Sequence, residues 1–192
     1  MKNIVLTVIM CLATTLLLAD DFEKSQHNFR VRSGNHGLEL REEINSDKDH
    51  IQYSYFGVKN TEMRMRYVDN LESKEYRPQV SYMMYRGQHL FLKPRLDYRY
   101  FIGEKPDYFS FRTSFGWDYF LSPKHRLWSE INPIWEFGQG RENDFNLDKA
   151  QFRLGVDYVM SDIIVGPFIQ YETNNHFERT DTFLGTNVTL KF

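Results

Sequence analysis

The chain has 192 residues, of which 41% are hydrophobic and 16% aromatic, and its formal net charge is −2. This length is typical of a single domain, and so small a net charge favours no class of partner by itself. After residue 19 no stretch approaches the roughly 20 consecutive apolar residues of a transmembrane helix, which excludes such a helix from that part of the sequence.

Residues 1–19 predict a secretory signal peptide. Lys2 provides the positively charged start, residues 4–18 form an apolar run, and Ala19 is a small residue after which cleavage is expected. A transmembrane helix is the alternative, but the run is short for one.

The only cysteine is Cys11, which lies inside the apolar run. It would leave with the signal peptide, so we expect a mature chain without a thiol, a disulfide or a thiolate metal site. Residues 20–36 are polar and predict a flexible lead-in, in which residues 28–32 could form a short strand.

Residues 37–192 alternate apolar and polar side chains with the period of two that is typical of β-strands. Ten strands are predicted, most of them about long enough to cross a bilayer when tilted. Their expected ranges are 37–44, 50–58, 62–68, 75–85, 89–101, 107–120, 126–137, 150–160, 163–172 and 182–192.

The connections between these strands are expected to alternate between short and long. The short ones are 59–60, 86–88, 122–124 and 161–162; the long ones are 45–49, 69–74, 102–106, 138–149 and 173–181. Short periplasmic turns and longer outer loops are typical of outer-membrane barrels, and an even strand number would place both termini on the periplasmic side. We therefore expect an all-β fold, a transmembrane antiparallel up-and-down β-barrel of about ten strands, with twelve as the alternative.

The last expected strand alternates up to the terminal Phe192. Closing strands of bacterial outer-membrane barrels usually end on an aromatic residue that the assembly machinery reads, so Phe192 is the expected assembly signal. The expected location is the cell outer membrane, with the lipid bilayer and the barrel-assembly machinery as partners.

A soluble β-sandwich is the competing fold. Against it, the apolar face is unusually aromatic, with Phe109, Phe111, Phe115, Trp117 and Tyr119 in a single strand. Prolines also fall on the apolar faces of expected strands, where each would remove a ladder hydrogen bond and so predicts a bulge or irregularity. These prolines are Pro78, Pro94, Pro133 and Pro167.

Charged residues fall on the opposite face of the strands, which would line the lumen, because Arg or Lys at the bilayer midplane on the lipid face costs about 2–4 kcal/mol. Four adjacent strands carry an expected basic track of Arg64, Arg66, Arg77, Lys93, Arg95, Arg99 and Arg112, with only Asp97 and Asp118 opposing it there. The opposing wall carries the acidic residues Glu130, Glu136, Asp157 and Glu172, together with Arg153.

This charge distribution favours a channel for anions, since a field across a narrow pore draws anions along its basic side. The alternative is a barrel closed by its own side chains, with a structural or adhesive role through the loops 138–149 and 173–181. No nucleophile and base can be paired from the sequence, although His176 and Glu178 lie near the expected outer mouth, so we expect no enzyme and no cofactor. Nucleic acid is not an expected partner, because the arginines lie inside the barrel and the Phe and Tyr rings face away from them.

Several segments resemble the oligogalacturonate-specific porins, small monomeric outer-membrane channels that include sialic-acid porins. They are residues 38–43 with 45–48, the Tyr-Arg-Pro-Gln-Val-Ser-Tyr run at 76–82, the Leu-Asp-Tyr-Arg-Tyr run at 96–100, and the terminal residues 188–192. The resemblance implies a monomer that passes acidic oligosaccharides along lumenal arginines, which would here be Arg77, Arg95, Arg99 and Arg112. Family members have twelve strands, so either the lead-in supplies further strands or this barrel is narrower, with the missing hairpin expected between residues 68 and 75.

Overall fold

The structure is a computed structural model that describes residues 24–44, 48–57, 60–70, 73–138 and 147–192. The predicted signal peptide, 1–19, lies outside the described residues. Within the described part of the chain, no helix is long and apolar enough to cross a membrane.

The described residues form an all-β fold. Its strands are β1 (Lys24–Ser33), β2 (His36–Ile44), β3 (Lys48–Phe56), β4 (Thr61–Asn70), β5 (Ser73–Tyr82), β6 (Tyr85–Arg86), β7 (Leu90–Ile102), β8 (Tyr108–Ser122), β9 (His125–Gly138), β10 (Lys149–Val159), β11 (Ile163–Asn174) and β12 (Arg179–Lys191). Each of the ten predicted strands is confirmed within three residues at either end.

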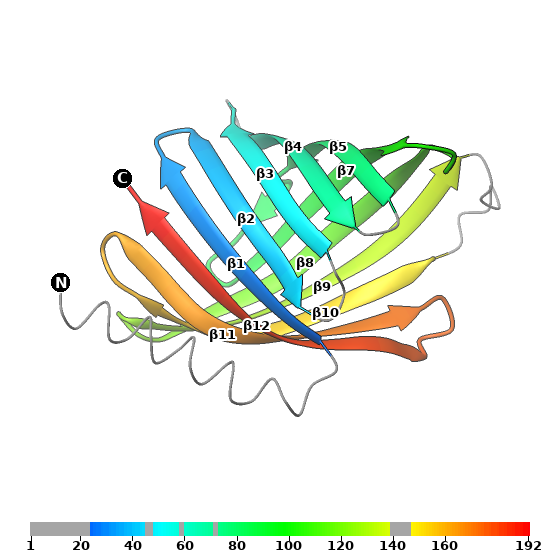
Figure 1. Ribbon diagram of the computed structural model, residues 1–192. Coiled ribbons are helices and arrows are strands. Elements are labelled where there is room, and N and C mark those ends of the chain that lie inside the picture. Colours follow the sequence, from blue (N-terminus) through cyan, green and yellow to red (C-terminus); the bar gives the residue numbers. More distant parts are fainter. Residues whose placement is uncertain (1–23, 45–47, 58–59, 71–72, 139–146) are drawn as a thin grey trace.

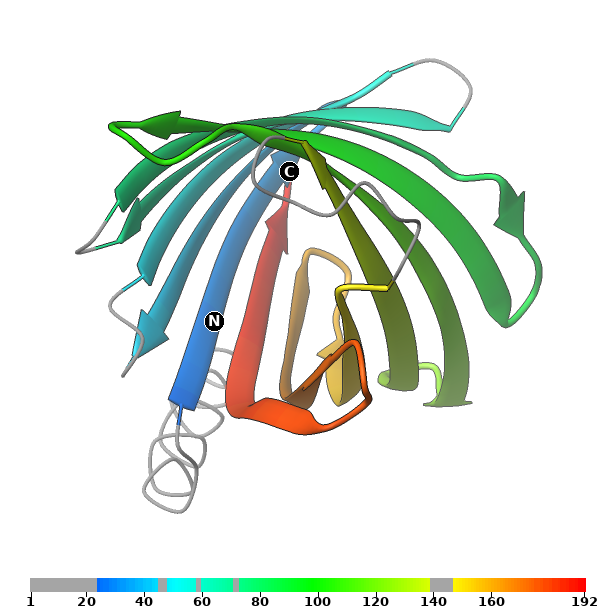
Figure 2. The same cartoon turned by 90° about the vertical axis from the view of Figure 1, so that its right-hand side faces the viewer.

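The strands close into a β-barrel (Figures 1 and 2). Apart from β5 and β6, consecutive strands pair antiparallel along the chain; β1 pairs with β12, and β5 pairs directly with β7. The barrel therefore has eleven strands, and the two-residue β6 pairs only with the turn-side end of β7. The count falls between the ten and twelve strands that the sequence allowed.

The additional strand, β1, comes from the segment that the sequence predicted to be a flexible lead-in. It pairs with β2 on one side and β12 on the other. Its alternation is present, with Phe29 exposed and Gln26 and Asn28 buried. However, its polar flanks resemble coil, and only pairing with two neighbours makes so polar a segment stable as a strand. No hairpin is inserted between residues 68 and 75, where the comparison with twelve-stranded porins had placed the missing one.

The barrel closes through a parallel pair, as β1 (blue) and β12 (red) show in Figure 1. The expectation that both ends of the barrel chain lie on one side is therefore wrong, because an odd number of alternating strands makes the first and last parallel. Phe192 lies at the end where β1 turns into β2, and its backbone N–H donates to the Arg32 carbonyl at 2.8 Å. Lys24 lies at the opposite end, where it pairs with Asp181.

The two ends of the barrel carry different connections. At the turn end, β1 leads into β2, β8 into β9 and β10 into β11 through two or three residues each. At the loop end, β9 leads into β10 through 139–148, whose residues 139–146 lie outside the described part. The difference is smaller than predicted, because 69–74 was expected to be a long loop and only residues 71–72 separate β4 from β5.

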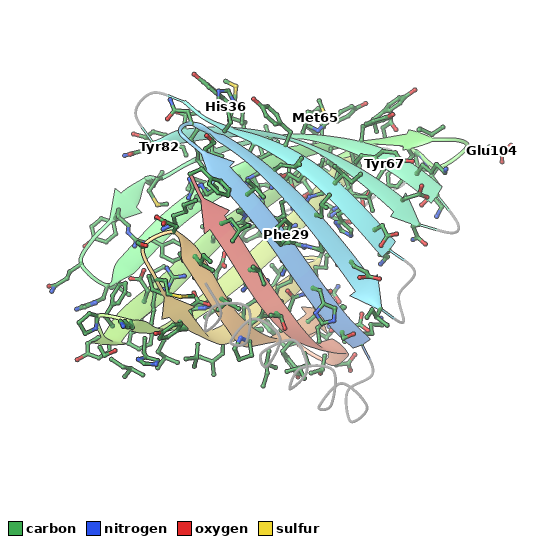
Figure 3. All side chains as sticks on the ribbon, turned by 60° about the vertical axis from the view of Figure 1, so that its left-hand side comes forward. Phe29, His36, Met65, Tyr67, Tyr82 and Glu104 are labelled. Carbon is green, nitrogen blue, oxygen red and sulfur yellow. The ribbon has the colours of Figure 1, made fainter. Side chains whose placement is uncertain are left out.

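The barrel is polar inside and apolar outside. Large apolar side chains are exposed around its outer surface, for example Met65 at 49% and Tyr82 at 47% (Figure 3). Most of the buried side chains are polar or charged, including Gln52 and Asp97. This distribution confirms the alternation predicted for the strands and is the reverse of a soluble globular domain.

The four strand prolines lie where the ladder is interrupted on one side, as predicted. Residues 166–167 of β11 do not pair with β10, residue 133 of β9 does not pair with β8, and residues 77–78 of β5 do not pair with β7. The β5–β7 ladder stops at Arg95, so it does not include Pro94. On its other side each proline keeps its neighbour, so the barrel stays continuous.

Candidate functional site

The turn-end half of the barrel encloses a polar cavity of about 460 Å³. Among the described residues, twelve that line it are cationic: Arg30, Arg32, Arg41, Arg64, Arg66, Arg86, Lys93, Arg95, Arg112, Arg126, Arg153 and Lys191. Four are acidic: Glu39, Asp118, Glu130 and Asp157. The cavity therefore has a large excess of positive charge, although the whole chain is slightly acidic.

A second cavity of about 410 Å³ lies at the loop end. Its cationic lining residues are Lys48, Arg77, Arg99 and Lys105. The rings of Phe101 and Tyr108 lie on the same wall, stacked with centroids 5.7 Å apart. None of the described residues lines both cavities.

All seven predicted track residues line one of these cavities. Arg64, Arg66, Lys93, Arg95 and Arg112 line the turn-end cavity, whereas Arg77 and Arg99 line the loop-end cavity. All seven therefore face the lumen, but they are distributed over two spaces. Strand alternation predicts which face a side chain takes and says nothing about where the lumen narrows.

Asp97 lies between the two cavities. It is fully buried, with its Oδ1 3.3 Å from Arg95 Nε and its Oδ2 3.9 Å from Arg112 Nη2. Its register neighbours, Gln79 on β5 and Ser110 on β8, are also buried. These side chains form a buried polar patch on the wall between the two cavities.

The strands that carry the basic track hold further inward-facing carboxylates besides the predicted Asp97 and Asp118. Glu62 accepts from Arg64 Nε at 2.7 Å and also pairs with Lys93. Glu75 pairs with Arg77. Both carboxylates share strand parity with the arginines, but they lie at the first residue of a predicted strand, where facing is hard to assign.

Two track arginines are not held tightly by a carboxylate. Arg66 has no ion pair within 4.0 Å among the described residues, and instead its Nε and Nη2 donate to the Gln52 amide oxygen at 2.9 and 2.6 Å. Arg112 is 3.9 Å from Asp97 and donates to the Gln151 amide oxygen at 3.2 Å. Buried cations without a close counter-charge are costly unless water or a bound anion solvates them.

The opposing wall is mixed rather than acidic. Glu130 and Asp157 line the turn-end cavity as expected, but Asp157 pairs with Arg126. Glu136 pairs with the track residue Arg99 at 3.3 Å. The Glu172 carboxylate lines neither cavity and accepts from the Gln151 and Gln170 amides at 2.6 and 2.7 Å.

Further basic residues of the turn-end cavity were not in the predicted track. Arg30 and Arg41 both pair with the buried Glu39, and Arg126 reaches the cavity from β9. Arg30 lies in the segment predicted as a lead-in, which hid its facing. Arg41 and Arg126 share strand parity with inward residues, and that signal was available in the sequence.

Aromatic rings also point into the lumen, which the sequence analysis had not expected. Phe91, Trp128 and Phe168 each lie against an inward-facing glycine of the neighbouring strand, where a Cβ would meet the ring: Gly116, Gly155 and Gly185, respectively. Phe91 and Trp128 line the turn-end cavity. The expectation that the Phe and Tyr rings face away from the arginines is therefore wrong. A glycine on the adjacent strand leaves room for the inward rings of Phe91 and Phe168. The Tyr108 hydroxyl accepts from Arg99 Nη1 at 2.5 Å.

The described residues contain no group of three or more His, Asp or Glu side chains that could hold a metal ion. His176 and Glu178 lie exposed in the connection from β11 to β12, where Asn174 Nδ2 donates to Glu178 at 2.8 Å. Neither a protein-family model nor a curated protein matches the chain.

Proposed function

We propose that this protein is an outer-membrane channel for anionic solutes. The observation that carries the proposal is the turn-end cavity, in which twelve cationic residues meet four acidic ones inside a barrel whose outer surface is apolar. An excess of guanidinium and ammonium groups in a confined space raises the local concentration of anions. The apolar exterior is suited to lipid.

Acidic sugars or short acidic oligosaccharides are the proposed solutes. The resemblance to oligogalacturonate-specific porins supports this class. Of the four arginines that this resemblance implies, Arg95 and Arg112 line the turn-end cavity, and Arg77 and Arg99 line the loop-end cavity. Contacts in such a path must be weak and numerous, since a tightly held solute would block it. The barrel needs no cofactor or energy source for diffusion, and the family resemblance favours a monomer.

The alternative proposal is a closed barrel with a structural or adhesive role. The buried polar patch around Asp97 favours it, because none of the described residues lines both of the cavities on either side. Conductance distinguishes the two proposals, because a closed barrel carries no current.

The channel proposal predicts a barrel that is stable in detergent and conducts ions in a planar bilayer. Unboiled protein should migrate differently from boiled protein on a gel and give a sheet-type circular dichroism spectrum. Under a salt gradient, the reversal potential should indicate a preference for anions. A protein that is soluble and folded without detergent would argue against the membrane location, and a folded barrel without conductance would favour the closed alternative.

Phe192 is proposed as the assembly signal, and its deletion provides a separate test. Phe192 is 80% exposed. Among the described residues, its backbone hydrogen bond is to the Arg32 carbonyl. Removing Phe192 should therefore not change the barrel once it has formed. The deletion should lower the yield of folded protein in the outer membrane several-fold. Lys191→Ala, one residue earlier, serves as a control that keeps the aromatic end. Equal folded yield for the deletion and the wild type would contradict this role.

A further inference from the structure

We propose that Trp128 and Arg153 form a binding subsite for a sugar ring that bears a carboxylate, such as a uronate. This inference deepens the proposed channel function and rests on it for its biological meaning. The subsite lies on the wall formed by β9, β10 and β11, on residues outside the predicted basic track.

The first element of the subsite is the flat indole of Trp128. A Cβ at Gly155 would point into the lumen and meet Trp128 Cζ2, Cε2 and Nε1 at 2.5, 2.6 and 2.8 Å. One face of the indole therefore lies against the barrel wall at Gly155. Because Trp128 also lines the turn-end cavity, part of the indole is accessible from that space. Such a platform suits the apolar C–H face of a pyranose ring.

The second element is the guanidinium of Arg153. It lies 4.6 Å from the Phe168 ring centroid and 5.7 Å from the Trp128 ring centroid. No carboxylate among the described residues comes within 4.0 Å to form an ion pair with it, although its register neighbour is Glu130. Aromatic faces thus hold this cation in position, and its charge is only partly offset by Glu130. The guanidinium therefore keeps its capacity to bind a solute carboxylate.

The third element is a set of polar groups that suit sugar hydroxyls. The same cavity is lined by Glu130, Asn132, Gln151 and Gln170, which come from the same three strands. Amide and carboxylate groups offer both donors and acceptors, as a hydroxyl requires. An aromatic face together with a few polar groups and one charge is the usual composition of a small-ligand site, and a cavity of about 460 Å³ lies within the common size range.

The combination distinguishes a uronate from simpler solutes. A small inorganic anion uses only the guanidinium, and a neutral sugar uses only the indole and the polar groups. A uronate uses all three elements at once. The subsite would therefore retain sugar acids in a lumen whose other cations attract any anion.

The test is calorimetric titration of the detergent-solubilised barrel at low ionic strength, with three probes. Trigalacturonate carries both rings and carboxylates, tripolyphosphate carries charge without a ring, and maltotriose carries rings without charge. Wild-type protein should bind trigalacturonate more tightly than either of the other two. Trp128→Leu should weaken trigalacturonate binding at least fivefold and change tripolyphosphate binding less than twofold, whereas Arg153→Gln should weaken both.

Two further variants control the experiment. Trp117→Leu removes a tryptophan from the outer face, where Trp117 stacks on Tyr119, and should leave all affinities unchanged. Trp128→Phe keeps a flat ring and should retain most of the affinity, which separates loss of the platform from damage to the fold. The heat-dependent gel shift reports folding of each variant.

The inference is overturned if wild-type protein does not bind trigalacturonate, or if Trp128→Leu binds it as the wild type does. It is also overturned if Trp128→Leu weakens tripolyphosphate binding by the same factor. Conductance is measured separately in a bilayer. A barrel that binds trigalacturonate through Trp128 but carries no current would refute the channel and leave the subsite intact, and a conducting barrel without this binding would do the reverse.

Discussion

Replacing Arg66 and Arg112 together by glutamine should lower the anion-to-cation permeability ratio of the proposed channel about thirtyfold. Both side chains line the turn-end cavity, and neither has a carboxylate closer than 3.9 Å among the described residues. Each guanidinium should contribute on the order of 1 kcal/mol to anion attraction in a wet lumen. Two such contributions, about 2 kcal/mol together, correspond to about a thirtyfold change.

The choice of these two arginines avoids a confounding effect. Neutralising Arg95 would remove the closest partner of the buried Asp97, 3.3 Å away, and an unpaired buried carboxylate would perturb the fold. Removing Arg66 and Arg112 leaves that pair in place. Glutamine also keeps a donor that reaches toward the amide oxygens of Gln52 and Gln151.

The measurement is the reversal potential under a salt gradient, with Lys74→Gln plus Lys124→Gln as the control. That pair also removes two positive charges, but both lysines are exposed and line neither cavity. The control should keep nearly wild-type selectivity. If the arginine variant and the control give the same reversal potential, the cavity cations do not select the permeating ion.

Gly166→Ala should strongly reduce the stability of the barrel. A Cβ at this position would collide with the Val156 carbonyl oxygen and would lie 2.7 Å from Asp157 Cα. These are backbone atoms of the neighbouring strand, so no side chain can rotate away, and β10 itself would have to move. Such overpacking typically costs about 1–3 kcal/mol, and more where the neighbour is rigid.

Gly37→Ala is the matched control, because Gly37 also faces the lumen from a strand. A Cβ there would have its nearest neighbours at 3.4–3.7 Å, which is ordinary contact. We expect the urea midpoint for loss of the folded gel band to fall clearly for Gly166→Ala and little for Gly37→Ala. Equal midpoints for the two variants would show that β10 can give way at this position.

The sequence by itself determined the strands and the direction of most side chains. Alternation with period two is a local property, so the ten predicted strands and the inward facing of Arg64 and Arg95 could be read without knowing which strands pair. The irregularities at the prolines were also predictable from the sequence, because proline lacks the N–H needed for a ladder hydrogen bond whichever strand lies beside it. The prediction missed β1 as a full strand, because polar residues on both of its faces make the alternation hard to recognise in the sequence. Pairing with β2 and β12 stabilises this strand.

Only the tertiary structure decided the closure, the ion pairs and the inward rings. With β1 added, the barrel has an odd number of strands instead of an even one. The first and last strands, β1 and β12, therefore run parallel. The predicted separation of an acidic wall from a basic one failed because Glu136 on β9 pairs with Arg99 on β7, across the one intervening strand β8. This contact depends on the register between strands. Trp128 shares parity with Glu130, but its inward ring needs Gly155 opposite it on β10. Alternation sets the face of each residue along one strand, whereas register between strands sets its partners, and register arises only when the barrel closes.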